Sequence, residues 1–373
     1  MVWFGRLRST SQGRFARKTS RISTFTRPYS IYLRLCQFFM DLLIKNKLPL
    51  ILAIALYILI YFVRLNQGGW EIETEVLKDQ RAALDKQLAK YLPSPKVELL
   101  SGILLGQDGQ LPVGLQLALR DTSTLHIVVA SGQNLSMVAG FFFFLSGVIK
   151  RKNAIILSFM AVIFYVLLTG VQLPVLRAAI MVTLAFLAEL LGRERDGVWV
   201  LIATTGLMLL VNPTWIGSLS FQLSVLATFG VIVVSPIFLD KLKRVPNLIS
   251  QDLAVSFGAQ LMVLPIIAQN FHQISLVALP TNLLVLWTVP FLMIGGAILL
   301  VTSFIPFLGS VVAWFLNILL SYFIHVVEFF GSMPFAWSYI GEQLWIVWVG
   351  YYLIIFAVLI SLQKSNIHQE KDY

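Results

Sequence analysis

The stretch HIVVASGQNLSMVAG, from His126 to Gly140, opens an apolar run long enough to cross a bilayer, yet it carries five polar side chains. They are His126, Ser131, Gln133, Asn134 and Ser136. Hydrocarbon penalises each such group unless it has a partner or lines a wet cavity. Gly132, Ser136 and Gly140 also recur at intervals of four, a small-residue stripe that lets a second helix approach closely. The stretch therefore predicts a helix that packs tightly and lines a polar space.

The composition of the chain is that of a membrane protein. Apolar residues make up 58% of the 373 residues and charged residues 12%, whereas soluble domains have roughly 45–50% and about 25%. An all-α fold is expected, a polytopic helical bundle in the membrane, because backbone polar groups in lipid must be satisfied within each helix. The single cysteine, Cys36, excludes an intrachain disulfide, and its basic surroundings give no indication of a nucleophile or a metal site.

Positive charge is concentrated in residues 1–47, which contain ten Lys or Arg against one acid, Asp41. We expect a disordered cytoplasmic tail there. Direct contact of this tail with nucleic acid is a less favoured alternative, because retention of basic residues inside the cell and attraction to lipid headgroups explain the same charge. The basic region is too long for a signal peptide, so the apolar run at 48–65 is expected to remain as an anchor span.

Hydropathy predicts ten membrane spans, which puts both termini on one side. They lie near 48–65, 126–149, 154–170, 173–191, 198–211, 220–239, 252–269, 275–303, 306–330 and 343–362. Basic clusters at 150–152, 193–195 and 241–244 occupy alternate short loops, and this places both termini in the cytoplasm. Residues 126–362 then form the polytopic core and residues 363–373 a second cytoplasmic tail.

Residues 66–125 are expected outside the cytoplasm. Their first part predicts a charged, solvated amphipathic helix of about five turns, ended by Pro93 and Pro95. Their second part holds two apolar pieces that are too short to span, separated by Gly106, Gly109 and Pro112. Such pieces are typical of interfacial or re-entrant helices.

Further polar residues lie at breaks within the apolar segments. They are Arg177, Gln222, Ser224, Gln260 and Asn282, and the breaks include Asn212, Pro213 and Pro265. Each one alone is explained by an interhelical hydrogen bond or a snorkelling cation, worth about 0.6–2 kcal/mol. Their concentration at helix breaks favours a pathway or binding cavity. For this role we select nine residues: His126, Ser131, Gln133, Asn134, Arg177, Gln222, Ser224, Gln260 and Asn282. Structural roles are expected for Gly132, Ser136, Gly140, Asn212, Pro213 and Pro265.

Seven short segments between residues 99 and 300 occur in a recognisable order and spacing. They are LSGILLG at 100–106, the opening stretch, LPVLRAAIM at 173–181, GRERD at 192–196, NP with SFQLSVLATFG at 212–230, AQLMVLPIIAQNF at 259–271 and ISLVALPTNLL at 274–284. Together they resemble the ComEC competence family of DNA-internalisation channels. The resemblance implies a channel core through which one strand of incoming DNA crosses the cytoplasmic membrane, with single-stranded DNA and the lipid bilayer as partners.

The sequence departs from the family pattern in three places. Asn134 stands where the family commonly has a second histidine, and it cannot become a cation. Residues 66–97 are too short for the OB-type domain of many members. The four histidines show no HxHxDH pattern, so no metallo-β-lactamase-like nuclease, no metal and no cofactor are expected. The resemblance then leaves nuclease, DNA-receptor or helicase functions to separate proteins; it gives no oligomeric state.

Two other classes of protein remain as alternatives. An ion-coupled small-molecule or lipid transporter typically places Asp or Glu at the membrane midplane, whereas Glu189 and Glu328 lie near span ends. An intramembrane hydrolase using His126 and Ser131 is disfavoured, because these residues lie about 140° apart around a continuous helix and no third orienting carboxylate accompanies them. A non-enzymatic channel is therefore predicted.

Overall fold

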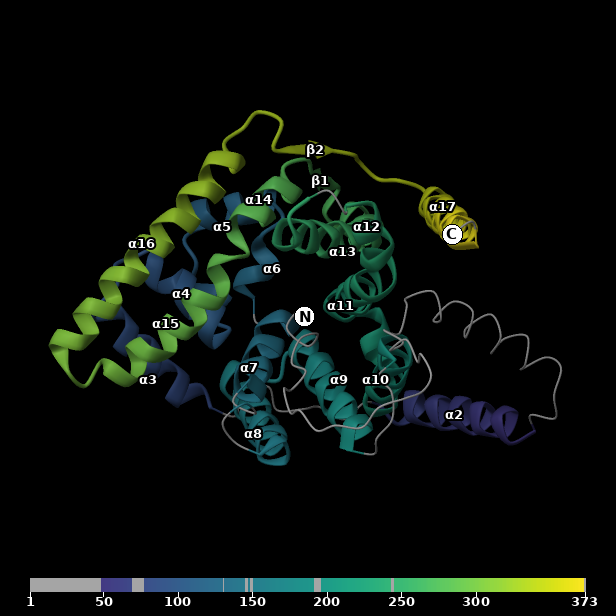
Figure 1. Ribbon diagram of the computed structural model, residues 1–373, viewed down its shortest axis with the longest axis horizontal. Coiled ribbons are helices and arrows are strands. Elements are labelled where there is room, and N and C mark those ends of the chain that lie inside the picture. Colours follow the sequence, from purple (N-terminus) through teal and green to yellow (C-terminus); the bar gives the residue numbers. More distant parts are fainter. Residues whose placement is uncertain are drawn as a thin grey trace, which may run out of the picture.

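The computed structural model describes residues 48–68, 77–129, 131–144, 147, 150–190, 196–242 and 245–371. The predicted tail at 1–47 and the basic residues 193–195 and 243–244 lie outside this part of the chain. The described residues fold into packed helices and one small pair of strands (Figure 1).

The first nine helices run from the predicted anchor to the middle of the chain. They are α2 (Leu48–Gln67), α3 (Lys78–Ala89), α4 (Lys96–Leu105), α5 (Val113–Asp121), α6 (Leu125–Val128), α7 (Gly132–Phe144), α8 (Arg151–Thr169), α9 (Leu173–Leu190) and α10 (Gly197–Val211). Short 3₁₀ turns cover Asp108–Gln110 and Pro213–Gly217.

The remaining helices follow in the second half of the chain. They are α11 (Leu219–Phe229), α12 (Ser235–Lys241), α13 (Asn247–Phe271), α14 (Ala278–Val285), α15 (Thr288–Thr302), α16 (Pro306–Gly331) and α17 (Trp345–Lys371). A π turn at Gly230–Val234 joins α11 to α12. Pro236 lies two residues after this turn and has no N–H to donate. The regular α-helical hydrogen bonding is therefore interrupted there, which is a physical reason for the wider π turn. Strands β1 (Gln273–Ser275) and β2 (Trp337–Tyr339) pair antiparallel and tie the loop after α13 to the loop after α16.

Each of the ten predicted spans falls on helix, but fewer helices meet the length and apolarity of a full span. Within the described residues four do: Leu219–Lys241, Ile249–Phe271, Pro306–Gly331 and Trp345–Leu362. The consecutive helices α14 and α15 add one broken span, bent by 42°. Shorter apolar helices occupy Leu52–Gln67, Asn153–Thr169 and Gly197–Val211. The described part of the chain is thus almost entirely helical, as in an all-α membrane protein, and its helices are often short or interrupted.

The predicted continuous helix over 126–149 is divided in the structure. α6 ends at Val128, Val129 is extended, and α7 starts only at Gly132. The Ser131 hydroxyl accepts the backbone N–H of Asn134 at 3.3 Å, which is the bond that a helix-capping serine makes. The polar residues of the opening stretch therefore begin a helix instead of interrupting one.

The segment that we expected at the membrane interface contributes to the main core. Leu99, Leu100, Ile103 and Leu105 of α4 are fully buried, and α4 packs against α15 and α16. Figure 1 shows α3 to α6 gathered beside these two helices. Protein therefore covers the apolar side chains of α4; whether α4 is interfacial or re-entrant, the two positions expected for this segment, stays a prediction.

The helices on either side of α4 are more exposed. α5 buries Leu115 and Leu119 but leaves Val113 and Leu117 exposed, so it keeps an amphipathic character. α3 has 12 residues, fewer than the predicted five turns. It is not solvated on all sides, because Leu88 is buried and the buried Arg81 donates from Nε to Leu168 O at the end of α8, at 2.9 Å.

Candidate functional site

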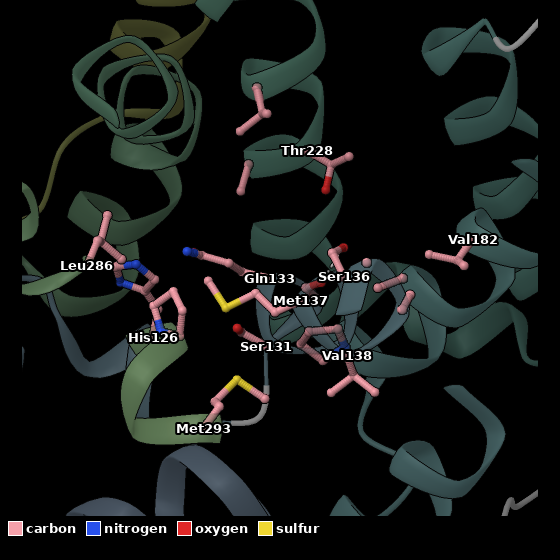
Figure 2. A pocket seen from close by; sticks show the side chains of 18 of the residues that line it. His126, Ser131, Gln133, Ser136, Met137, Val138, Val182, Thr228, Leu286 and Met293 are labelled. Atoms are coloured by element: carbon pink, nitrogen blue, oxygen red, sulfur yellow. Dashed lines mark hydrogen bonds between the residues drawn. The ribbon is translucent and has the colours of Figure 1, made fainter. Parts of the chain in front are cut away.

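A cavity of about 3350 Å³ lies among the helices of the core. Its walls come from α6 to α9, α11, the π turn, α13, α14 and α15. Small-molecule pockets usually occupy roughly 300–1,000 Å³, so this space is several times larger than a small ligand needs. Figure 2 shows part of the wall, with side chains from α6, α7 and α11 facing the same space.

Seven of the nine predicted pathway residues line this cavity: His126, Ser131, Gln133, Arg177, Ser224, Gln260 and Asn282. The remaining two, Asn134 and Gln222, are not among its lining residues. The structure thus brings together side chains that lie as far as 156 positions apart in the sequence. Of the residues expected to be structural, Gly132, Ser136 and Gly140 also line the cavity, whereas Asn212, Pro213 and Pro265 do not.

The first turn of α7 is fixed by its own polar side chains. Asn134 is buried and donates from Nδ2 to Ile103 O of α4 at 3.1 Å, while Ser131 Oγ donates to Asn134 Oδ1 at 3.1 Å. These bonds tie α7 to α4 and direct the Asn134 amide away from the cavity. Gln133, one position earlier, points into the open space (Figure 2).

Only one member of the predicted small-residue stripe makes a close contact between helices. A Cβ atom on Gly132 would lie 2.8 Å from Arg177 Nη2 and 3.0 Å from Ala178 Cβ of α9. A Cβ on Gly140 would meet no atom within 4 Å, and Ser136 Oγ donates to Gly132 O of its own helix at 2.8 Å. Of the two glycines of the predicted stripe, only Gly132 therefore lies where α9 approaches α7 closely.

Arg177 connects α9 with α11 at the cavity wall. Its side chain is 8% exposed, donates from Nε to Ser224 Oγ at 2.7 Å and from Nη1 to the sulfur of Met181 at 3.2 Å. The described residues provide no carboxylate within salt-bridge distance of its guanidinium. Met181 follows Arg177 by one helical turn, and Thr228 lies one turn after Ser224, where it donates to Ser224 O at 2.8 Å.

His126 and Ser131 do not form a catalytic pair in this geometry. His126 Nδ1 donates to Ser123 O at 2.9 Å, and the Ser131 hydroxyl is bonded to Asn134 Oδ1. The imidazole lies next to Leu286, to the left of Ser131 in the view of Figure 2. A serine nucleophile needs its hydroxyl proton directed at a base, so the arrangement disfavours hydrolysis.

Two carboxamides of the cavity wall have unsatisfied oxygens. Gln260 Oε1 of α13 and Asn282 Oδ1 of α14 are buried, and the described residues give neither a hydrogen bond. Buried amide oxygens without a partner are uncommon and each needs an explanation, such as a water or a ligand. Gln222 behaves differently: its Nε2 donates to Ile216 O at 2.8 Å, which closes the turn before α11.

Asn212 and its neighbours form a helix boundary. Asn212 Oδ1 accepts the Thr214 N–H at 3.0 Å and the Thr214 hydroxyl at 2.6 Å, and Pro213 starts the 3₁₀ turn. Pro265 lies inside α13. These positions suit the structural roles that we expected from their residue types.

Several polar residues of the cavity wall were not among those selected from the sequence. They include Arg120, Thr228 and Asp252. Thr228 follows Ser224 by four positions on one helix, so the helical repeat offered a signal for it. Arg120 and Asp252 carried no local sequence signal that set them apart.

No group of three or more His, Cys, Asp or Glu residues is placed to hold a metal ion in the described ranges. The polar part of the lining offers amides, hydroxyls, the His126 imidazole, guanidinium groups and the carboxylates of Glu189 and Asp252. These can bind a polar ligand or its phosphates by hydrogen bonds.

These features define a helical membrane protein with a large cavity lined partly by polar residues. A family model described as Competence protein matches residues 103–365. The chain therefore belongs to the competence protein family, which confirms the resemblance seen in its sequence segments.

Three curated relatives are similar to this chain. ComE operon protein 3 of Bacillus subtilis (strain 168) is 25% identical over 306 residues, covering 80% of this chain and 39% of the relative. The uncharacterized protein YcaI of Escherichia coli (strain K12) is 25% identical over 61% of this chain and 35% of its own length. An uncharacterized protein of Aquifex aeolicus (strain VF5) is 30% identical over 53% of this chain and 47% of its own length. The chain thus spans less than half the length of these relatives, and no solved structure matches it.

Proposed function

We propose that this chain forms the membrane part of a DNA-uptake channel and that single-stranded DNA crosses the cytoplasmic membrane through the cavity described above. The observation that carries the proposal is a cavity of about 3350 Å³, lined by seven polar residues chosen from the sequence, in a member of the competence protein family. The similarity to a protein named for the ComE operon supports a role in competence.

The chemistry of the wall suits a flexible polyanion. A strand in transit needs hydrogen-bond donors that bind weakly and few fixed anions that would repel phosphates. The cavity-lining carboxylates are Glu189 and Asp252. Glu189 pairs with Arg151, and each carboxylate lies near the end of its helix, away from the first turn of α7.

The proposal includes a topology for this chain and assigns other steps of DNA uptake to separate proteins. Ten spans place both termini in the cytoplasm, with residues 66–125 outside, and the chain has no catalytic role. Separate proteins supply receptor, nuclease or helicase functions where these are needed.

A lipid or small-molecule transporter is the second candidate, because many lining side chains, including Phe141 and Phe144, are apolar. The first experiment compares DNA uptake by cells with and without the chain and localises a labelled strand inside or outside the membrane. We expect internalisation to require the chain. Normal internalisation without it would reject the DNA proposal and leave the transporter.

A second experiment tests whether the cavity is the path. In a Cys36→Ser background, Ser136→Cys places a thiol on the cavity wall, and a membrane-impermeant thiol reagent should then block uptake. Ser332→Cys is the matched control, because Ser332 is exposed but does not line the cavity. If the reagent affects uptake equally in the two variants, the cavity is not the path of the strand.

A further inference from the structure

Arg177 is a buried cation with hydrogen-bonding capacity to spare. A guanidinium has five N–H donors. Arg177 uses one on Ser224 Oγ and one on the Met181 sulfur, and a thioether is a weak acceptor. The described part of the chain offers it no other acceptor. A buried charge without a counter-ion is unfavourable, so the remaining donors at the cavity wall point to a missing anionic partner.

The other arginines of the cavity wall are already neutralised. Arg120 forms an ion pair with Asp121 at 3.1 Å, and Arg151 forms one with Glu189. Glu189 follows Arg177 by 12 positions on α9, which is about 18 Å along a helix. Arg177 is thus the cavity-lining arginine that the described residues leave without a carboxylate.

The start of α7 adds further donors beside Arg177. Nη2 lies 2.8 Å from the Cβ position of Gly132, so the guanidinium lies against the first residue of a 13-residue helix. Ser131 caps the N–H of Asn134, and the described residues provide no acceptor for the N–H groups of Gly132 and Gln133. Free N–H groups and the helix dipole favour an anion at this end, which opens onto the cavity that Gln133 also enters (Figure 2).

We infer that Arg177 and the first turn of α7 bind one phosphodiester group. The site suits a phosphodiester because its oxygens accept paired N–H bonds from a guanidinium and from backbone amides. The inference rests on the proposed function for its preferred source, the backbone of single-stranded DNA. A phospholipid headgroup carries the same group and is the other source that the experiment distinguishes.

The binding experiment uses the purified full-length chain in nanodiscs of phosphatidylcholine. A labelled oligothymidylate is titrated over a range of salt concentrations, in parallel with a methylphosphonate oligomer whose backbone is uncharged. We expect Arg177→Gln to weaken oligothymidylate binding by about tenfold and to reduce the slope of log K against log salt by about 0.7. The methylphosphonate oligomer should bind the parent and the variant equally.

Ser224→Asp is the variant that separates binding from folding. Ser224 Oγ is 2.7 Å from Arg177 Nε, so a carboxylate there supplies the counter-ion internally. The chain should remain folded, with thermal stability equal to or above that of the parent, while oligothymidylate binding falls as in Arg177→Gln. Arg81→Gln is the matched control, since Arg81 is also 8% exposed but does not line the cavity; its oligothymidylate affinity should equal the parent's.

The outcomes test the phosphodiester site separately from the proposed function. Loss of oligothymidylate binding in Ser224→Asp supports a DNA phosphodiester at this site. Unchanged oligothymidylate binding together with loss of a co-purified phospholipid, measured by mass spectrometry, supports the headgroup instead. If neither ligand responds in folded variants, the inference is overturned even where cellular uptake still requires the chain. If uptake does not require the chain, the proposed function fails, and these binding measurements still decide the phosphodiester site.

Discussion

Gly132 is the residue at which α7 and α9 come closest. Its substitution by Leu places side-chain atoms where Arg177 Nη2 and Ala178 Cβ already lie, 2.8 and 3.0 Å from the first added carbon. We expect Gly132→Leu to lower the free energy of unfolding by about 1–3 kcal/mol. The loss should appear as reduced thermal stability and a reduced yield of monodisperse protein in detergent.

Gly140 provides the control from the same predicted stripe. No atom lies within 4 Å of its Cβ position, so Gly140→Ala should leave stability unchanged or raise it slightly, because alanine is the better helix former. A Gly132→Leu protein as stable as the Gly140→Ala protein would show that α7 and α9 do not depend on this contact. The two glycines look equivalent in the sequence, and only the position of α9 separates them.

Asn134 is predicted to act through folding and not through transport. Asn134→Ala removes the donor to Ile103 O and leaves a buried carbonyl unsatisfied, at a cost of about 1–3 kcal/mol. Gln133→Ala is the neighbouring control, since Gln133 extends into the cavity (Figure 2). Thermal denaturation should therefore distinguish the pair: a stable Asn134→Ala protein with impaired uptake would return Asn134 to the pathway.

At the scale of helices, α4 provides the clearest test of the core. Leu100 is fully buried, so Leu100→Ala should cost about 2–5 kcal/mol. Val113→Ala on α5 is the contrasting substitution, because Val113 is 71% exposed and surface changes usually stay within about 0.5 kcal/mol. Similar stabilities for the two variants would favour the interfacial position that the sequence predicted for both segments.

The helices were more predictable than their contacts. Each apolar segment became helix because the backbone needs internal hydrogen bonds in an apolar environment. Pro93 and Pro95 lie in the break between α3 and α4, and Gly106 ends α4 in the left-handed conformation that glycine allows. The burial of α4 was not predictable, since hydropathy reports removal from water but not whether lipid or protein replaces the water. The same limit applies at Asn134: its residue type predicts a hydrogen bond, but the partner, Ile103 O, lies 31 positions away.

For the molecule as a whole, the orientation in the membrane is open to a direct test. Reporters fused after Lys152, Arg195 and Arg244 should be cytoplasmic, because these loops are basic, while one near Lys86 should be outside. The structure gives an independent reason to expect Lys86 and Lys152 on opposite sides of the membrane. Arg81 of α3 is bonded to Leu168 O near the C-terminal end of α8, whereas Lys152 is at the start of that helix.

α8 contains 19 residues and is therefore about 28 Å long, close to the thickness of the hydrocarbon layer. If α8 crosses the membrane, Lys86 and Lys152 must be on opposite sides, whichever direction the chain takes. Cytoplasmic reporters at both positions would mean that α8 does not cross, and the path proposed through the cavity would lose one of its walls. Reporters on opposite sides but exchanged would preserve the cavity and reverse its direction, so the start of α9, which carries Arg177, would face the other side of the membrane.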